Sequence, residues 1–342
     1  MSMFPGRECR AYKHTDPKEK FLSFCTTNTY SLLLRVLKVL IGHFNILLYI
    51  IFKTKNTDVL YFYSPNIKTT IFTLFLAKRL GRQTVVDIVE LFQSEKNTWY
   101  NRLGDKWAFK YATYPFAISE SLIRLGSAYT NTKIVRLPII VDFKRFDRSI
   151  RTQLKLIGYI GTSAAKDGLD VVLRGFALAL RSDPTLKLRL IGPKPIHFDY
   201  DKLIHQLDLY ENVELTGSKS YEEVPSLLLD CDTYIMNRDD SDFSKYGYPT
   251  KLGEYFACKR PVLMSNGVGF SLDYTDKVEA IKYEVENPSS LADAIAWRYD
   301  NNEESQMIAK NGYDYALTHF ASEVVGAKFW DIVQEFGKDV KG

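Results

Sequence analysis

The chain has 342 residues, of which 46% are hydrophobic and 25% charged, and its formal net charge is +4. This length is sufficient for two domains with their own cores, and the composition is typical of a soluble folded protein, not of a disordered or fibrous one. The first 20 residues are polar and charged, so we expect no signal peptide.

The charge is distributed unevenly along the chain. Residues 1–150 contain 23 Lys and Arg against 11 Asp and Glu, a net charge of +12, whereas residues 151–342 contain 22 against 30, a net charge of −8. A basic half favours an anionic partner. The sequence has no helix-turn-helix, zinc or RNA-binding motif, so we expect no nucleic acid. An anionic membrane surface fits better, because each basic residue near it gains about 1 kcal/mol. A solvated basic surface is the alternative.

The sequence indicates neither a metal site nor a cofactor. The four cysteines are far apart and fit no metal-ligand spacing, so we interpret them as reduced thiols of a cytosolic protein. The five histidines form no pair at metal spacing. An Asp-x-Asp pattern at Asp240 and Asp242 could offer hard oxygen ligands, but it lies in a predicted polar loop, Arg238–Ser244, and we do not expect it to bind metal.

Tyr30–Phe52 is the most hydrophobic segment and is long enough to span a bilayer. However, Arg35, Lys38, His43 and Asn45 interrupt it, and such groups are costly within a membrane. Two interpretations remain. The leading one is a core helix of a Rossmann-like domain; the second is an interfacial helix with Arg35 and Lys38 at the lipid headgroups.

Strand and helix patterns then alternate, which predicts a parallel sheet covered on both faces. The segment Pro138–Phe146 leaves this first domain. The predicted strands are Val59–Tyr63, Gln83–Asp87, Phe116–Ser119 and Ile134–Leu137, and the predicted helices are Thr70–Leu80, Trp107–Tyr114 and one beginning at Glu120.

The second half repeats this alternation. The predicted strands are Leu156–Gly161, Lys187–Ile191, Val213–Gly217, Asp232–Asn237, Pro261–Met264 and Ile281–Val285. The predicted helices are Leu169–Leu180, Asp201–Leu207, Tyr221–Leu229, Lys251–Cys258 and three at the end of the chain, the last being Glu323–Phe336.

The stretch from Tyr246 to Leu263 contains the main ligand-binding signal. Gly247 and Pro249 predict a tight strand-to-helix turn, whose backbone N–H groups lie at a helix N-terminus and so form an anion site. Lys251 adds a full positive charge there, and Glu254 can accept two hydroxyl donors, as a ribose offers. These groups together predict a site for a nucleoside diphosphate.

The pattern Pro249-x-Lys251-Leu-x-Glu254-Tyr-x-Ala-x-x-x-Pro-Val resembles the donor-site motif of family 4 glycosyltransferases, which are retaining enzymes of the GT-B fold. Ala117–Ser121 and Pro138–Phe146 also have close counterparts in that family, the second being the interdomain linker. The resemblance implies an α/β protein with two Rossmann-like domains whose parallel sheets face across a cleft.

On this resemblance, residues 1–147 form an acceptor-side domain and residues 148–320 the nucleotide-sugar domain. Residues 321–342 form a terminal helix that returns to the first domain. The family's opening strand is not recognisable, so the first domain is shortened. Either Phe21–Cys25 serves as that strand or the chain is truncated at its start.

The segment Gly161–Gly168 resembles the family's phosphate loop, in which Lys166 reaches a phosphate. An Arg often found after the first Gly is Thr162 here, which removes one positive charge. A Glu often found eight residues before Glu254 is Tyr246, which we interpret as a change of donor preference. Strand ends are expected to line the base pocket. The predicted donor-binding residues are Gly161, Thr162, Ser163, Lys166, Gly192, Thr216, Gly217, Tyr246, Gly247, Tyr248, Pro249, Thr250, Lys251 and Glu254.

In the first half, many family members carry a His near the end of the strand Gln83–Asp87, whereas this chain has Val89. Glu90 is therefore the candidate on the acceptor side, with a structural strand-end carboxylate as the equal alternative. The predicted catalytic residues are Glu90, Lys166 and Glu254.

The resemblance implies a metal-independent, cofactor-free, retaining hexosyltransferase of polysaccharide synthesis. Its partners would be a nucleotide-diphosphate sugar, a lipid-linked or saccharide acceptor, and an anionic membrane. We expect it in the cytoplasm, peripheral on the inner face of the plasma membrane. The alternatives are a non-catalytic nucleotide-sugar-binding or scaffold subunit and a sugar-nucleotide epimerase of the same fold.

Overall fold

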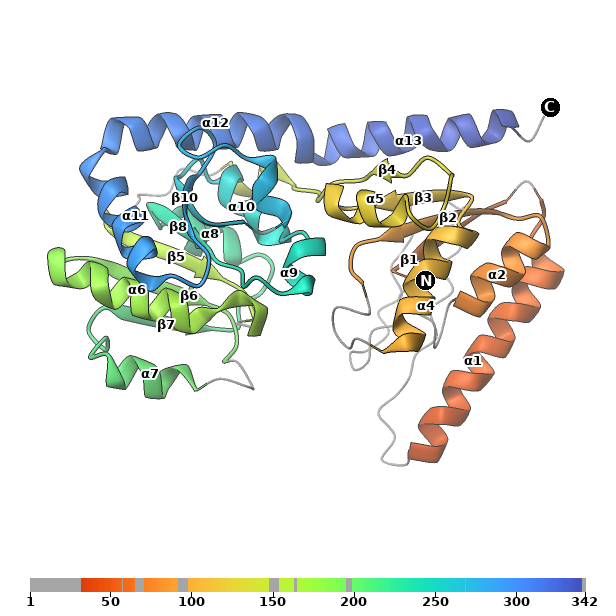
Figure 1. Cartoon of the computed structure of the whole chain (residues 1–342), viewed down its shortest axis with the longest axis horizontal. Helices are drawn as coiled ribbons and strands as arrows, with labels where there is room; N and C mark the ends of the chain where they lie inside the picture. The colour runs from red at the N-terminus through yellow and green to blue at the C-terminus, as the bar shows by residue number, and fades with distance from the viewer. Residues whose placement is uncertain are drawn as a thin grey trace. The chain divides into compact units, whose positions relative to one another are not determined.

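The structure, a computed structural model, describes residues 32–56, 58–64, 71–91, 98–147, 154–162, 165–194, 199–267 and 269–339. The chain divides into two compact units, residues 138–331 and the remainder, which comprises residues 1–137 and 332–342 (Figure 1). The predicted strand Phe21–Cys25 lies outside the described residues.

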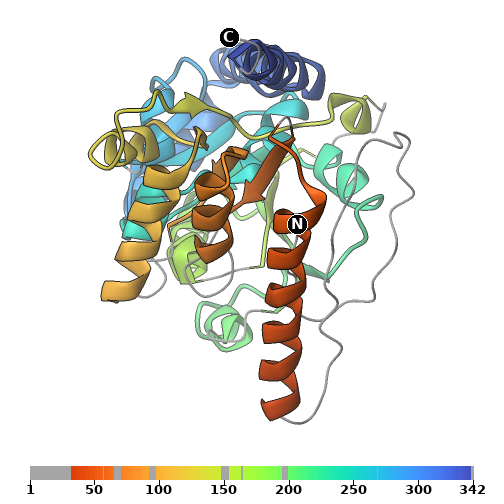
Figure 2. The same cartoon turned by 90° about the vertical axis from the view of Figure 1, so that its right-hand side faces the viewer.

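The first unit contains a sheet of parallel strands in the order β1-β2-β3-β4. Helix α1 lies beside α2 (Figure 1 and Figure 2). The strands are β1 (Val59–Tyr63), β2 (Gln83–Ile88), β3 (Tyr114–Ala117) and β4 (Val135–Arg136), and the helices are α1 (Leu32–Lys53), α2 (Ile71–Arg79), α4 (Trp99–Tyr111) and α5 (Glu120–Gly126).

All four strands predicted in this unit are found, within two residues at each end. The prediction for α4 is wrong at its start, because the helix begins at Trp99 and not at Trp107. Thr98 caps it, with its hydroxyl accepting a hydrogen bond from the Asn101 amide at 3.4 Å. No helix within the described ranges is long and apolar enough to cross a membrane.

The second unit contains a parallel sheet in the order β10-β9-β8-β5-β6-β7. The strands are β5 (Leu156–Ile160), β6 (Lys187–Ile191), β7 (Val213–Gly217), β8 (Thr233–Met236), β9 (Val262–Asn266) and β10 (Ile281–Glu284). The helices are α6 (Leu169–Ser182), α7 (Tyr200–Gln206), α8 (Val224–Leu229), α9 (Asp242–Tyr246), α10 (Thr250–Ala257), α11 (Pro288–Asp300), α12 (Asn302–Phe320) and α13 (Ser322–Asp339), whose last residues belong to the first unit.

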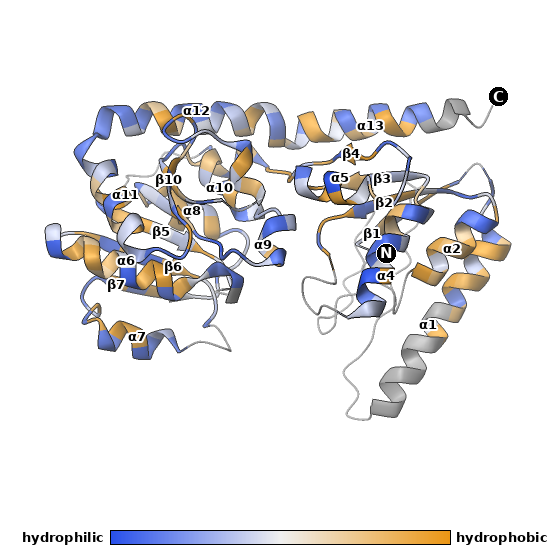
Figure 3. Cartoon of the chain, viewed as in Figure 1, coloured by the Kyte–Doolittle hydropathy of each residue, from blue (hydrophilic) through white to orange (hydrophobic). Residues whose placement is uncertain are grey.

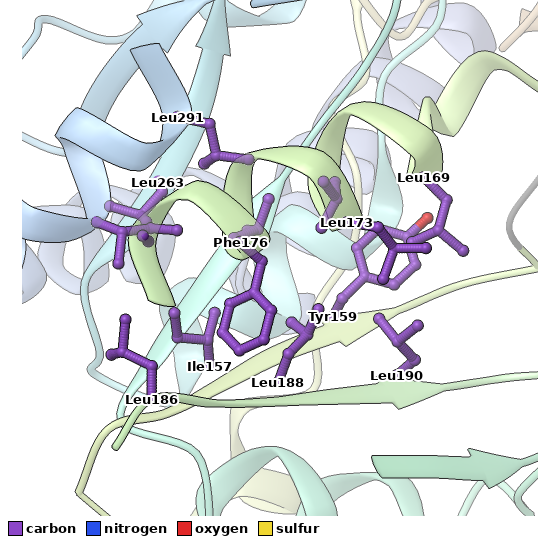
Figure 4. Close-up of a cluster of buried hydrophobic side chains, with 14 of the residues drawn as sticks. Ile157, Tyr159, Leu169, Leu173, Phe176, Leu186, Leu188, Leu190, Leu263 and Leu291 are labelled. Atoms are coloured by element: carbon purple, nitrogen blue, oxygen red, sulfur yellow. The ribbon is translucent and has the colours of Figure 1, made fainter. Parts of the chain in front are cut away.

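Alternate residues of the central strands face opposite sides of this sheet, as the two-residue period of a strand requires. On one side Ile157 and Leu188 are fully buried, and Phe176 of α6 points onto them (Figure 4). Both hydrophilic and hydrophobic residues occur along the length of α6, as in a helix that buries one face and exposes the other (Figure 3). On the other side, the ring of Tyr234 stacks on Tyr255 of α10 with centroids 4.5 Å apart. The sheet is therefore buried on both faces.

The linker segment packs against the second unit. Val141 forms backbone hydrogen bonds with the junction of α12 and α13, donating to the Phe320 carbonyl at 2.8 Å and accepting from the Ser322 amide at 3.1 Å. A Cβ placed on Gly253 of α10 would lie 2.3 Å from the Val141 side chain, so only glycine allows this approach. For this reason residues 138–147 group with the second unit.

The strand order of the second sheet creates a topological switch point. From β5 the chain proceeds through β6 to β7 on one side, and from β8 through β9 to β10 on the other. Ligands of open parallel sheets bind at the carboxyl ends of the two strands that flank such a point. The loops after β5 and β8 are therefore where a ligand is expected.

Two local predictions for this unit are wrong. The segment Arg238–Ser244 is not entirely loop, because α9 forms from Asp242 with Ser241 as its cap. The predicted strand-to-helix turn at Gly247 therefore connects two helices. Helix α8 begins at Val224 and not at Tyr221, because Pro225 favours the first turn of a helix and Ser220 and Glu223 are held in the turn before it.

Glycines let the carboxyl ends of β5, β6 and β7 approach one another. The Gly161 amide donates to the Ile191 carbonyl at 3.0 Å, and the Gly192 amide donates to the Gly217 carbonyl at 3.1 Å. Gly192 has φ +144°, and a Cβ there would lie 1.9 Å from the Gly161 carbonyl oxygen. Position 192 therefore excludes every side chain.

We expect Gly192→Ala to lower the free energy of unfolding by about 3 kcal/mol, because strain and a backbone collision add together. Gly326→Ala is the matched control, since a Cβ there meets nothing within 4 Å, and it should change stability by no more than about 1 kcal/mol, upward. Urea denaturation measures both. Equal stabilities for the two variants would contradict the close approach of β5 and β6.

Candidate functional site

Asp167 is the centre of a buried charge cluster at the switch point. It follows β5 and is 3% exposed. Its Oδ1 accepts a hydrogen bond from Lys251 Nζ at 3.0 Å, and Arg238 Nη1, from the segment after β8, lies 2.7 Å from the same oxygen. Lys251 Nζ also donates to the Tyr159 hydroxyl at 3.1 Å. Segments distant in the sequence thus converge on one carboxylate.

The electrostatics of this cluster follow from burial. Burial alone would raise the pKa of the Asp167 carboxyl, but Lys251 and Arg238 outweigh it and hold that pKa below its usual range. Burial lowers the pKa of Lys251 to about 8, although Asp167 opposes the change. Arg238 and Lys166 also lower the pKa of Lys251, because their positive charges repel its ammonium group. An anionic ligand would relieve this repulsion.

Arg238 joins the cluster with one side-chain nitrogen that makes no hydrogen bond among the described residues. Its Nη1 is buried and makes no hydrogen bond within the described part of the chain, although it lies within ion-pair distance of Asp167. A buried guanidinium N–H without a hydrogen-bond acceptor is costly. A phosphate oxygen is a suitable acceptor for such a group.

The loop that carries Asp167 is held in place by hydrogen bonds from the Asn237 side chain. The Asn237 side-chain amide donates to the carbonyls of Asp167 at 2.9 Å and Gly168 at 3.1 Å, and the Tyr283 hydroxyl donates to Asn237 Oδ1 at 2.8 Å. Gly168 has φ +52°, and a Cβ there would lie 2.5 Å from Asn237. These contacts keep the carboxylate in place before any ligand binds.

Lys166 lies near the same cluster but faces α9. Its Nζ is 3.5 Å from the centroid of the Phe243 ring, and its carbonyl accepts a hydrogen bond from the Asp239 amide at 3.0 Å. It is close enough to affect the pKa of both Asp167 and Lys251. Lys166 and Lys251, predicted to act together, are therefore brought into one cluster.

Glu254 lies one turn after Lys251 in α10 and forms an ion pair within the second unit. Arg145 Nη1 donates to Glu254 Oε1 at 3.0 Å. Arg145 also donates to the Tyr221 carbonyl at 2.6 Å, and its guanidinium lies 3.4 Å from the centroid of the Tyr221 ring. Burial raises the pKa of Glu254, and Arg145 partly offsets this effect. The linker residue Arg145 thus orients the carboxylate predicted to bind ribose.

The stretch from Tyr246 to Thr250 supplies mostly backbone. Tyr246 ends α9, and the Gly247 amide donates to the Phe243 carbonyl at 3.0 Å. The Tyr248 side chain is buried, with its hydroxyl 2.6 Å from that of Tyr274, so it belongs to the core and only its backbone can contact a donor. Pro249 is the N-cap of α10, and Thr250 is exposed at its first position.

The remaining predicted donor residues lie at strand ends. Gly161, Gly192 and Gly217 are joined by the backbone hydrogen bonds described above. The Thr216 hydroxyl donates to the Gly217 carbonyl at 3.2 Å, so it braces the backbone. Thr162 is exposed directly after β5, and Ser163 lies outside the described residues.

In the first unit, Glu90 is exposed two residues after β2. The buried carboxylate nearby is Asp87, whose Oδ2 accepts a hydrogen bond from the Tyr61 hydroxyl at 2.6 Å. Burial raises the pKa of Asp87, and the Tyr61 bond opposes the change. Asp87 Oδ1 is buried and has no hydrogen-bond partner among the described residues.

Sequence reasoning missed Asp167, Arg238 and Arg145 as members of the site. Asp167 follows Lys166 directly in the phosphate-loop pattern, and Arg238 follows a predicted strand end, so both carried a signal at the carboxyl end of a strand. Arg145 carried none, because its role depends on how the linker packs. Within the described part of the chain no group of His, Cys, Asp and Glu side chains is arranged to hold a metal ion.

The chain is similar to known glycosyltransferases. It is 22% identical over 241 residues to an uncharacterized glycosyltransferase of Methanocaldococcus jannaschii, covering 69% of this chain and 65% of that protein. It is 22% identical over 182 residues to the alpha-D-kanosaminyltransferase of Streptomyces kanamyceticus, covering 53% of this chain and 46% of that protein. The chain thus spans about half to two thirds of these relatives' length.

The fold is similar to that of Anabaena HepE, solved in complex with UDP. The TM-score is 0.71 at 14% identity, and the match covers 87% of this chain and 82% of HepE. HepE has also been solved with UDP and glucose and with UDP-glucose. The two parallel sheets are thus those of the GT-B fold, as predicted.

The model of the family described as glycosyl transferases group 1 matches residues 141–315, just over half of the 342 residues. The match begins in the linker and includes the charge cluster at the switch point and the whole of α10. This chain belongs to the group 1 glycosyltransferases.

Proposed function

We propose that this protein is a retaining hexosyltransferase that moves a sugar from a nucleoside diphosphate sugar to a saccharide acceptor. The observation that carries this proposal is the pairing of Lys251 and Arg238 with one buried carboxylate at the switch point, with Lys166 close enough to act on that carboxylate electrostatically. Three cations around one anion leave positive charge for a diphosphate, at the place where the fold binds ligands.

In the proposed reaction these cations act chiefly in the transition state. The bond between the sugar's anomeric carbon and the diphosphate breaks, and the acceptor oxygen bonds to that carbon on the same face. The acceptor's proton passes to the departing phosphate oxygen. Negative charge grows on the diphosphate, so preorganised cations stabilise the transition state more than the ground state.

The donor proposed here is a uridine diphosphate sugar, because the structurally similar HepE has been solved with UDP and UDP-glucose. Glu254 would accept the ribose hydroxyls through the oxygen that Arg145 does not hold. The three strand-end glycines would let the nucleoside approach the backbone closely.

The acceptor proposed here is a lipid-linked saccharide of surface polysaccharide synthesis, reached on the inner face of the plasma membrane from the cytoplasm. This proposal is supported by the net charge of +12 on residues 1–150, which suits an anionic leaflet. It is independent of the donor proposal, because a basic surface and a diphosphate site are different features.

A second candidate is a nucleotide-sugar-binding subunit without turnover. It is favoured by one observation: Lys251 and Glu254 both have internal partners, Asp167 and Arg145. Incubation with labelled nucleotide sugars and a membrane extract separates the two. We expect label in the lipid fraction, whereas tight binding of nucleotide sugar with no transfer would support the subunit and contradict the enzyme.

We expect Glu254→Ala to weaken UDP binding by about 1.5–3 kcal/mol, roughly ten- to a hundredfold, because it removes charge-assisted hydrogen bonds to ribose. Isothermal titration calorimetry measures the affinity. Glu211→Ala is the control, as Glu211 is an exposed carboxylate of the same unit, and it should bind UDP like the unmodified protein. Unchanged affinity in Glu254→Ala would remove this residue from the site.

The pKa of Lys251, about 8, predicts a pH dependence of UDP binding. Above that pH the free protein loses the ammonium charge, so affinity should fall between about pH 7 and about pH 9. Lys251→Arg keeps its charge over this range, so its affinity should change much less with pH. Titrations of both proteins with the same ligand cancel any titration of UDP itself. If UDP affinity changed equally with pH in the two proteins, the Lys251 charge would have no role in binding.

A further inference from the structure

Helix α1 carries an apolar surface on the side opposite the core. Ile46, Ile50 and Thr54, the last directly after the helix, are buried at intervals of four residues, which defines the face that packs against the rest of the first unit. The opposite face should be polar in a helix that meets water. Instead it exposes large apolar side chains: Ile41 (58% exposed), Phe44 (60%), Leu48 (36%), Ile51 (40%) and Phe52 (73%).

These five residues, here called the α1 outer face, recur at intervals of three, four, three and one, so they form one stripe along the helix. Asn45 is an exposed polar residue on the same side. Isolated exposed apolar residues are normal on a protein surface, but a contiguous stripe of this size marks an interaction site.

The charge of the sequence segment that carries the stripe indicates what the stripe meets. Residues 32–82 contain eight Lys and Arg against one acidic residue, Asp58. Helix α1 itself contains no Asp or Glu, and Lys53 and Lys55 are exposed at its end. A helix with an apolar face, basic neighbours and no acidic residue is typical of segments that lie in the interface of an anionic membrane.

We propose that the α1 outer face docks on an anionic lipid bilayer, with its apolar side chains inserted at the level of the headgroups and the basic residues bound to anionic lipid. A second copy of this chain is a poorer occupant, because it would bring its own basic residues against these. The proposal names the docking surface for the membrane association proposed above and rests on it.

The test is copelleting with vesicles of phosphatidylcholine containing about one quarter phosphatidylglycerol. We expect the double variant Phe44→Ser/Phe52→Ser to bind at least about tenfold more weakly than the unmodified protein. The matched control is Leu272→Ser/Met307→Ser, which removes two equally exposed apolar side chains of the second unit, 67% and 63% exposed. It should bind the vesicles normally.

Two further measurements separate the explanations. UDP affinity and melting temperature should be unchanged in the double variant, so failure of the donor proposal would be visible independently of membrane binding. Unchanged vesicle binding in the double variant overturns the proposal. A lower melting temperature with unchanged vesicle binding also overturns it, because the stripe would then be covered by protein.

Should the double variant not fold, Phe52→Trp keeps the aromatic surface and reports insertion directly. Brominated lipids quench only a tryptophan that reaches the acyl chains. We expect quenching in Phe52→Trp beyond that of the unmodified protein, whose own tryptophans supply the baseline. Equal quenching in the two proteins would overturn the proposal.

Discussion

The pairing of a buried carboxylate, Asp167, with Lys251 and Arg238 is the interaction on which the ligand-binding end of the second unit depends. It joins the segment after β5, the segment after β8 and the start of α10. Removing one partner of a buried ion pair commonly costs about 3–5 kcal/mol, because the other charge is left without compensation. The same contacts that hold the three segments together therefore hold the cations where a diphosphate would bind.

This arrangement reconciles two demands. A cation must be present for the leaving diphosphate, yet an isolated ammonium buried in protein would lose its proton. Asp167 opposes the loss, while burial brings the pKa of Lys251 down to about 8. The linker makes a similar provision for Glu254 through Arg145. Lys251 and Glu254, which are both predicted to bind the donor, are thus oriented by partners from other segments, and this preorganises the site.

The two units carry different surfaces for different tasks. The second unit has glycine-lined strand ends and buried ion pairs, which suit the small anionic ligand proposed above. The first carries the basic charge and the apolar outer face of α1, which suit an extended anionic surface. The proposed donor site and the proposed membrane-docking face lie in different units, so each can be mutated separately.

The α/β alternation, the limits of most strands, the position of α10 and the proximity of Lys166 to Lys251 could be predicted from the sequence, because these depend on local periodicity and on motif spacing. Tertiary packing alone reveals that Arg238 pairs with Asp167, that Arg145 pairs with Glu254, and that the Tyr248 side chain is buried in the core. The α9 helix and the early start of α4 were also not predicted, although their caps, Ser241 and Thr98, are local contacts. The partners of Asp167 and Glu254, in contrast, are distant in the chain, and no local pattern encodes which side chains meet once parallel strands pack side by side.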